Sequence, residues 1–263
     1  MGRVAADTSQ VKKYQAPALE KGLDILEILS SHSMGLTQVE IARELNRSVG
    51  EIFRMLVVLC ERGYLSLDSV TDKYALTTKM FEISHRYPKI KRLSSLAAPV
   101  MNELAQKINQ SIHLAIFSDE SVLVIGQVDA PGYHGLSVRL GAKLDVWKAS
   151  SGRVILANSP QSLLDAHIAV APPGDQSEID TIKEELTKVR AKGYEQRRSY
   201  VIKGVTNVSV PLIDYSGYAI ACLTVPYIEM LDDHDQLPLR DCREALLKAA
   251  HYLSEQMGGN IAS

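Results

Sequence analysis

Four residues between positions 47 and 54 have the types and the spacing of a helix face that reads DNA. Positions i, i+3, i+4 and i+7 share one side of a helix, and here they hold Arg47, Gly50, Glu51 and Arg54. Arginine can form paired hydrogen bonds with guanine, and a bare glycine lets a helix approach a groove closely. The alternative is an ordinary helical hairpin with a solvated polar face.

Two predicted helix starts position this face. Thr37-Gln38-Val39-Glu40 and Ser48-Val49-Gly50-Glu51 both fit the capping-box pattern, in which a hydroxyl residue and a Glu three positions later bond each other's backbone N–H groups. Apolar residues at helical spacing follow each start. Asn46 and Arg47 leave room for only a tight turn between the helices. This pattern predicts a helix-turn-helix.

A predicted hairpin follows directly. Residues 64–67 and 73–76 alternate as strands around a turn-rich link, and an amphipathic helix beginning at Pro17 precedes the helix pair. Three helices and a hairpin predict a winged helix-turn-helix over residues 16–79, after a flexible arm at 1–15. We expect DNA contacts from Thr37, Gln38, Arg47, Ser48, Gly50, Glu51, Arg54, Thr71 and Lys73.

The pattern changes after residue 79. A helical linker is expected over 80–98. An amphipathic helix spans about Ile90 to Ile108, and Pro99 inside it forces a kink or a new helix start. Strands and helices then alternate, which predicts an α+β domain with an antiparallel sheet over 99–263. The expected strands are 111–117, 122–129, 135–140, 208–213 and 218–225. The expected helices are 150–157, a short one from Pro160, 178–191 capped by Ser177, and 238–257.

Composition excludes several classes of protein. With 46% apolar and 23% charged residues the chain is globular, and it contains no apolar run long enough to span a bilayer. The polar N-terminus has no secretory signal, and three scattered cysteines indicate reduced thiols in a cytoplasm. Residues 1–95 hold 14 Lys/Arg and 11 Asp/Glu, a mildly basic balance that suits a DNA-binding module.

The sequence offers little support for an enzyme. It contains no GxSxG, P-loop, GxGxxG or HExxH pattern, and the seven histidines do not have metal-ligand spacing. Residues 232–235, Asp-Asp-His-Asp, fit an acidic surface loop better than a cation site. We therefore expect no catalytic residue, metal or cofactor. An enzyme acting through a C-terminal pocket, or a DNA-binding protein without a ligand, remain the alternatives.

Ordered segments along nearly the whole chain resemble one family. They include Ala18–Leu26, Leu36–Ala42, Arg54-Met55-Leu56, Gly63-Tyr64, Tyr74-Ala75-Leu76, Ala149–Ala157, Gly193-Tyr194, Gly204-Val205-Thr206 and Ala221–Pro226. This succession is similar to the IclR (isocitrate lyase regulator) family of bacterial transcriptional regulators. The resemblance implies a winged-helix domain, a helical linker and a GAF-like domain that binds a small effector. It also implies a homodimer or homotetramer that binds operator DNA, and an effector that is an organic acid or an aromatic catabolite.

By motif, the resemblance nominates effector-binding residues Ser150, Ser151, Arg198, Asn207, Cys222 and Thr224. Ser150-Ser151-Gly152 at a helix N-terminus can bind a carboxylate, whereas simple N-capping by Ser is the structural alternative. The only tryptophan, Trp147, can pack over an effector or wedge the sheet. The chain departs from the family at 46–49, so the family's base preference does not carry over. Basic residues after Gly193-Tyr194 suggest a cationic pocket that favours an anion.

Overall fold

The computed structural model describes residues 16–85, 88–132, 135–170, 173–230 and 236–259. The predicted arm at 1–15 and the acidic loop at 232–235 lie outside the described residues. The chain divides into two compact units between Pro88 and Lys89, inside the segment predicted as a linker. Each unit has its own hydrophobic core.

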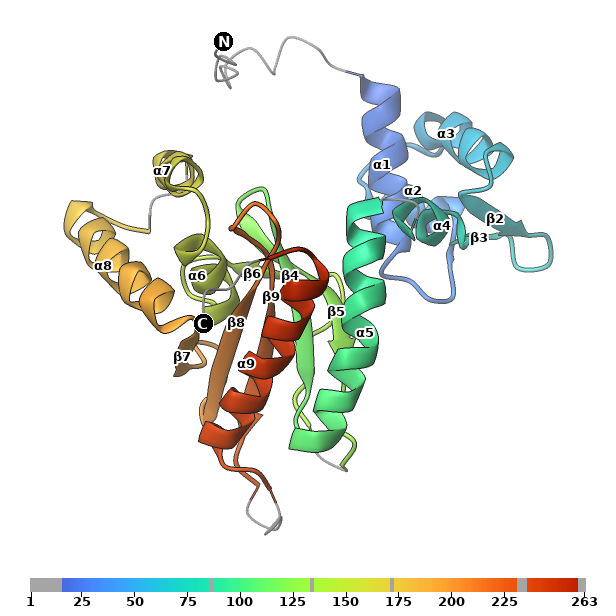
Figure 1. Ribbon diagram of the computed structural model, residues 1–263. Helices are drawn as coiled ribbons and strands as arrows, with labels where there is room; N and C mark the ends of the chain where they lie inside the picture. Colours follow the sequence, from blue (N-terminus) through green and yellow to red (C-terminus); the bar gives the residue numbers. More distant parts are fainter. Residues whose placement is uncertain (1–15, 86–87, 133–134, 171–172, 231–235, 260–263) are drawn as a thin grey trace. The chain divides into compact units, whose positions relative to one another are not determined.

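The N-terminal unit is a winged helix-turn-helix (Figure 1). Its helices are α1 (Pro17–Leu29), α2 (Gln38–Glu44), α3 (Val49–Glu61) and α4 (Lys79–His85). Strands β2 (Leu65–Asp68) and β3 (Lys73–Leu76) form the predicted hairpin, and the short β1 (Leu36–Thr37) pairs with β3. The apolar stripes of α1, α2 and α3 meet at Ile25, Ile41, Ile52 and Leu56, each without exposed surface. This core sets the angle between α2 and α3.

Helix α5 (Pro88–Ile108) continues through Pro99, so of the two predicted alternatives no new helix starts there. From Leu93 onward its inner face packs into the core of the C-terminal unit, with Ala97 and Met101. The last part of the predicted linker is therefore built into the second unit.

The C-terminal unit is a six-stranded antiparallel sheet in the order β6-β5-β4-β9-β8-β7 (Figure 1). The strands are β4 (Ile112–Ser118), β5 (Ser121–Val128), β6 (Lys143–Asp145), β7 (Glu195–Arg198), β8 (Val205–Ile213) and β9 (Ala219–Ile228). One face is covered by α5 and α9 (Leu239–Gln256). The other is covered by α6 (Ser150–Ala157), with α7 (Gln161–Val170) and α8 (Gln176–Lys192). The α+β prediction is confirmed.

Several local predictions were wrong. Residues 135–140 form no strand, because β6 and the turn that ends at Ala142 already occupy the outer edge of β5. Helix α8 begins earlier than expected: Asp175, not Ser177, is its N-cap and accepts hydrogen bonds from the backbone N–H groups of Ser177 and Glu178. Strand β7, with the sequence EQRR, was not expected.

Among the residues that the structure describes, no helix is both long and apolar enough to cross a membrane.

Candidate functional site

Helix α3 begins with a tightly bonded first turn. Glu51 accepts hydrogen bonds from the backbone N–H and the hydroxyl of Ser48, both at 2.9 Å, and forms an ion pair of 3.0 Å with Lys21 of α1. The backbone bond from Ser48 and the contact with Lys21 lower the pKa of Glu51 to about 2. Glu51 therefore stays ionised and fixes the start of α3 against α1. Its carboxylate, which the sequence assigned to DNA contact, is engaged in these bonds.

The first helix of the pair is fixed in the same way. Thr37 and Glu40 form a complete capping box at the start of α2. Gln38 donates a hydrogen bond of 3.2 Å to the carbonyl of Val49, which ties α2 to the first turn of α3. Both predicted capping boxes thus lie at helix starts, and each cap is worth about 1 kcal/mol.

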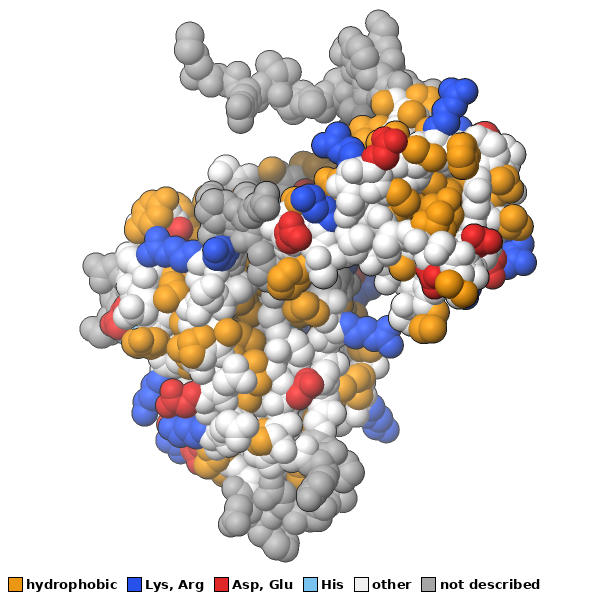
Figure 2. All heavy atoms as spheres, turned by 90° about the vertical axis from the view of Figure 1, so that its right-hand side faces the viewer, with side chains coloured by type: hydrophobic (Ala, Val, Ile, Leu, Met, Phe, Trp, Pro, Cys, Tyr) orange, Lys and Arg blue, Asp and Glu red, His pale blue; other side chains and the backbone are white. Residues whose placement is uncertain are grey.

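The exposed face of α3 leaves two of the predicted residues free. A Cβ at Gly50 would meet no atom within 4 Å, and within the described part of the chain no side chain pairs with the exposed Arg54. Arg47 lies 4.0 Å from Asp24, a weak contact at the surface. Figure 2 faces the side of this unit that carries α3 and the hairpin. Gly50 and Arg54 are thus the residues best placed to approach a partner.

The two predicted wing residues, Thr71 and Lys73, are held in different ways. The hydroxyl of Thr71 donates to Asp68 at 2.9 Å and so closes the hairpin turn. Lys73 pairs through its backbone with Asp68 and Thr37 in the three-stranded sheet. The unit is not basic: residues 16–79 hold seven Lys/Arg and nine Asp/Glu. The positive balance of residues 1–95 therefore comes from the arm and the linker.

A chain of buried hydroxyls lies between α6 and the sheet. Ser209 of β8 donates a hydrogen bond of 2.8 Å to the hydroxyl of Ser150, and its oxygen lies 2.7 Å from that of Thr224 on β9. The thiol of Cys222 is 4.0 Å from the Thr224 hydroxyl, and burial raises its pKa to about 12. Three predicted residues, Ser150, Cys222 and Thr224, therefore lie together, and Ser209 joins them.

His113 of β4 lies next to the chain of hydroxyls, directly across from Thr224 in the sheet. It is 3% exposed, and neither of its ring nitrogens has a hydrogen-bond partner among the residues that the structure describes. Burial lowers its pKa to about 4, so the ring is neutral at physiological pH. Gln127, which lies across from it on β5, also buries a side-chain oxygen that no described residue bonds. Buried polar atoms without partners are uncommon in proteins, and they mark a place where a ligand can supply the missing bonds.

Within the described part of the chain, no side chain caps the N-terminus of helix α6. Its N-cap is Ala149, so Ser150 does not cap the helix as the structural alternative required. All eight residues of the helix are buried. A Cβ at Gly152 would come within 2.2 Å of the carbonyl oxygen of Val146, so only glycine allows α6 to approach that segment. The uncapped first turn and Ser151, which is 1% exposed, lie beside the hydroxyl chain.

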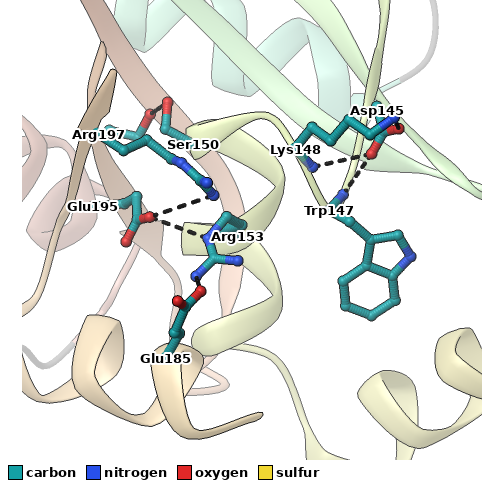
Figure 3. Close-up of polar contacts among 9 residues, drawn as sticks. Asp145, Trp147, Lys148, Ser150, Arg153, Glu185, Glu195 and Arg197 are labelled. Carbon is teal, nitrogen blue, oxygen red and sulfur yellow. Dashed lines mark hydrogen bonds and ion pairs between the residues drawn. The ribbon is translucent and has the colours of Figure 1, made fainter. Parts of the chain in front are cut away.

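An ion cluster around the buried Arg153 fixes the same helix (Figure 3). Arg153 donates to Glu195 of β7 at 3.1 Å and to Glu185 of α8, while its own side chain is only 4% exposed. Arg197 lies 3.9 Å from the same oxygen of Glu195. Two cations face two carboxylates, so the cluster carries no net charge and joins α6, α8 and β7.

The remaining predicted residues lie elsewhere on the second unit. Arg198 is exposed and lines a surface cleft formed by residues 198–206, whereas its neighbour Arg197 shares the side of β7 that carries Glu195. Asn207 pairs with Arg197 across the edge of the sheet. Trp147 lies with its ring centroid 5.0 Å from that of His167 on α7, apart from Ser150 in Figure 3.

Sequence reasoning missed Ser209, His113 and Arg153. Two of them carried a signal: His113 interrupts the apolar run of β4, and Arg153 lies inside the apolar run of α6. A charged residue in a helix that is buried on all sides requires a partner. Ser209 lacks such a signal, because a serine fits any strand.

Comparisons with known proteins agree with both units. The family model described as IclR helix-turn-helix domain matches residues 18–69, and the one described as Bacterial transcriptional regulator IclR C-terminal matches residues 85–255. The HTH-type transcriptional regulator KdgR of Escherichia coli is 25% identical over 244 residues, which cover 90% of this chain and 91% of that protein. The regulator BhcR of Paracoccus denitrificans is 25% identical over 90% of this chain and 86% of its own length.

Solved structures share the fold. An IclR homologue from Microbacterium hydrocarbonoxydans, in complex with 4-hydroxybenzoate, has a TM-score of 0.76 at 20% identity and covers 91% of this chain and 98% of its own. Pseudomonas aeruginosa HmgR has a TM-score of 0.73 at 23% identity, over 92% of this chain and all of its own.

Proposed function

This chain belongs to the IclR family of bacterial transcriptional regulators, and we propose that it binds operator DNA through α3 and controls that binding through a small ligand in its C-terminal unit. The observation that carries the DNA half of the proposal is the exposed face of α3. Its start is fixed by Glu51, and Gly50 and Arg54 are left free. A rigid helix with an open glycine and an unpaired arginine suits entry into a major groove.

The ligand half rests on the buried polar atoms around α6. The hydroxyls of Ser150, Ser209 and Thr224, the uncapped helix start and the unpartnered ring of His113 converge on one side of the sheet. These groups donate and accept hydrogen bonds in an apolar setting, which suits a small organic acid or an aromatic catabolite. A helix N-terminus there favours a carboxylate. The homologue in complex with 4-hydroxybenzoate, an aromatic carboxylate, supports the same class.

Control of DNA binding follows from linkage. A ligand that binds one arrangement of the protein more tightly than another shifts the population towards it, and operator affinity changes by the same coupling. We propose a cytoplasmic homodimer or homotetramer as the acting form, since a paired operator requires two reading helices at fixed spacing.

A mobility shift with DNA from upstream of the protein's own gene tests the proposal. The full chain should retard at least one fragment at low salt, and one fraction of a metabolite extract should change the apparent affinity severalfold. If the protein retards no upstream fragment and also enriches no duplex from a random-sequence pool, the DNA-binding half of the proposal is contradicted. Retardation that no metabolite fraction alters contradicts the ligand half.

Substitution of two neighbouring arginines tests whether the ligand binds at the hydroxyl chain or in the surface cleft. Arg197 lies on the side of β7 that carries Glu195, which stands across from Ser209 of the hydroxyl chain in the sheet, and Arg198 lies on the other side. With 4-hydroxybenzoate or an active metabolite fraction, Arg197→Gln should weaken the ligand response, and Arg198→Gln should leave it unchanged. The opposite result would place the ligand in the cleft of residues 198–206.

A further inference from the structure

Helix α3 carries a stripe of exposed apolar side chains that the fold does not use. Val49, Phe53 and Val57 recur at i, i+4 and i+8 and are 41%, 50% and 37% exposed. Ile52 and Leu56, which are fully buried, already form the side of the helix that packs into the core. A helix of a small domain normally has one apolar side towards the core, so this second stripe needs an explanation.

The stripe adjoins the free residues of the helix. Gly50, Phe53, Arg54 and Val57 stand at i, i+3, i+4 and i+7 and so form one outward face. Hydrophobic atoms gather on this side of the unit in Figure 2, with few cations among them. Phe53 lies in the second turn of α3, within the N-terminal half that contacts base edges in helix-turn-helix proteins.

The chemistry of the major groove offers one apolar group. Among base edges only thymine presents a methyl group, while the other groups are hydrogen-bond donors and acceptors. A phenyl ring and an isopropyl group can contact that methyl and can satisfy none of the polar groups. Residues 16–79 also carry no positive balance to hold DNA through phosphates alone.

We propose that Phe53, flanked by Val49 and Val57, recognises the methyl group of a thymine in the operator, next to the base contacted by Arg54. The proposal rests on the proposed function, in which α3 enters DNA. It makes Phe53 a specificity-determining residue whose contribution depends on one methyl group.

A second copy of the chain is the other occupant to consider, and the charges disfavour it. An interface over this face would bury Arg54, with which no described side chain of its own chain pairs, and a buried charge that the second copy did not pair would be costly. Exposed apolar residues on α1 and α4, among them Leu19 and Met80, provide a separate surface for association.

Removal of single methyl groups from DNA tests the proposal. A duplex selected from a random-sequence pool by the full chain is compared with copies in which deoxyuridine replaces each thymine in turn, which deletes only the methyl group. Wild-type protein should lose about fourfold in affinity at one or two thymines, the effect of one buried methyl-sized group. Phe53→Ala should bind the thymine duplex on the order of tenfold more weakly and show no further loss with deoxyuridine at those positions.

Two variants complete the design. Phe53→Leu, which keeps an apolar contact, should retain sensitivity to the methyl group. Met80→Ala removes an apolar side chain of similar exposure from α4 and should also retain sensitivity to the methyl group. Equal affinity of the wild type for thymine and deoxyuridine duplexes at every position would overturn the inference while leaving DNA binding intact. A lower solution mass for Phe53→Ala than for wild type would overturn it in favour of a second copy, and failure to enrich any duplex would overturn both proposals.

Discussion

The exposed face of α3 and the buried polar residues around α6 hold their functional groups by opposite means. On α3, the side chains come from one helix, and hydrogen bonds at the surface fix its start: Glu51 keeps its charge because Ser48 and Lys21 donate to it. Around α6, the groups come from β4, β7, β8, β9 and two helices, and burial sets their state: His113 loses its charge because water is excluded. The site on α3 is formed by one helix and should tolerate substitution, whereas the site around α6 depends on the packing of the whole C-terminal unit.

The largest expected effect is the loss of the buried arginine. Arg153→Met should destabilise the C-terminal unit by about 3 kcal/mol, because the buried Glu195 would lose its hydrogen-bonded partner and keep only the more distant Arg197. Urea unfolding followed by selectively excited tryptophan fluorescence reports on this unit, since Trp147 is the only tryptophan in the sequence.

The matched control is the ion pair between Arg240 and Glu244 on α9, whose side chains are 77% and 50% exposed. Arg240→Met should change the free energy of unfolding by less than about 1 kcal/mol. Equal losses in the two variants would remove the distinction between buried and exposed sites.

The same distinction explains what the sequence predicts. Helix α3 and its caps follow from residues three or four positions apart, and both capping boxes were expected at the helix starts where they lie. The hydroxyl chain joins Ser150 to a residue 59 positions away, and Arg153 reaches 42 positions to Glu195. Such contacts exist only once the sheet order is set. Strand β7 has no pattern of its own and depends on the free edge of β8, which is why the sequence did not predict it.

The next effect concerns pH. Burial lowers the pKa of His113 to about 4, whereas a histidine in an unfolded chain titrates near 6.5. Between these values the unfolded chain binds a proton that the folded chain does not, so stability is complete above about pH 6.5 and falls as the pH drops. We expect a loss of roughly 3 kcal/mol in the free energy of unfolding by about pH 4 from this group.

His113→Leu should remove that part of the pH dependence. Urea unfolding of both proteins at pH 7.5 and pH 4.5 measures it, and the difference in stability between the two pH values should be smaller in the variant. Identical pH dependence would mean that water or a rearranged partner solvates the ring, and that the site is less closed than the contacts indicate.

The smallest effects belong to the exposed site and appear in DNA affinity, not in folding. Arg54→Ala should cost about 1–3 kcal/mol on the preferred duplex and less on others, since a lost base contact relaxes specificity. Lys73→Ala on the wing should weaken binding to all sequences alike and reduce the salt dependence by about one phosphate contact. Titrations of the selected and a scrambled duplex at several salt concentrations separate the two patterns.

Arg54→Ala should not change the free energy of unfolding appreciably, because Arg54 is exposed and has no partner among the described residues. This outcome would complete the contrast with Arg153, where an arginine of the same chemistry holds the fold itself. A uniform loss for Arg54→Ala across all duplexes would assign this residue to the phosphate backbone. The discrimination between bases would then fall to the apolar stripe beside it, which the deoxyuridine series measures directly.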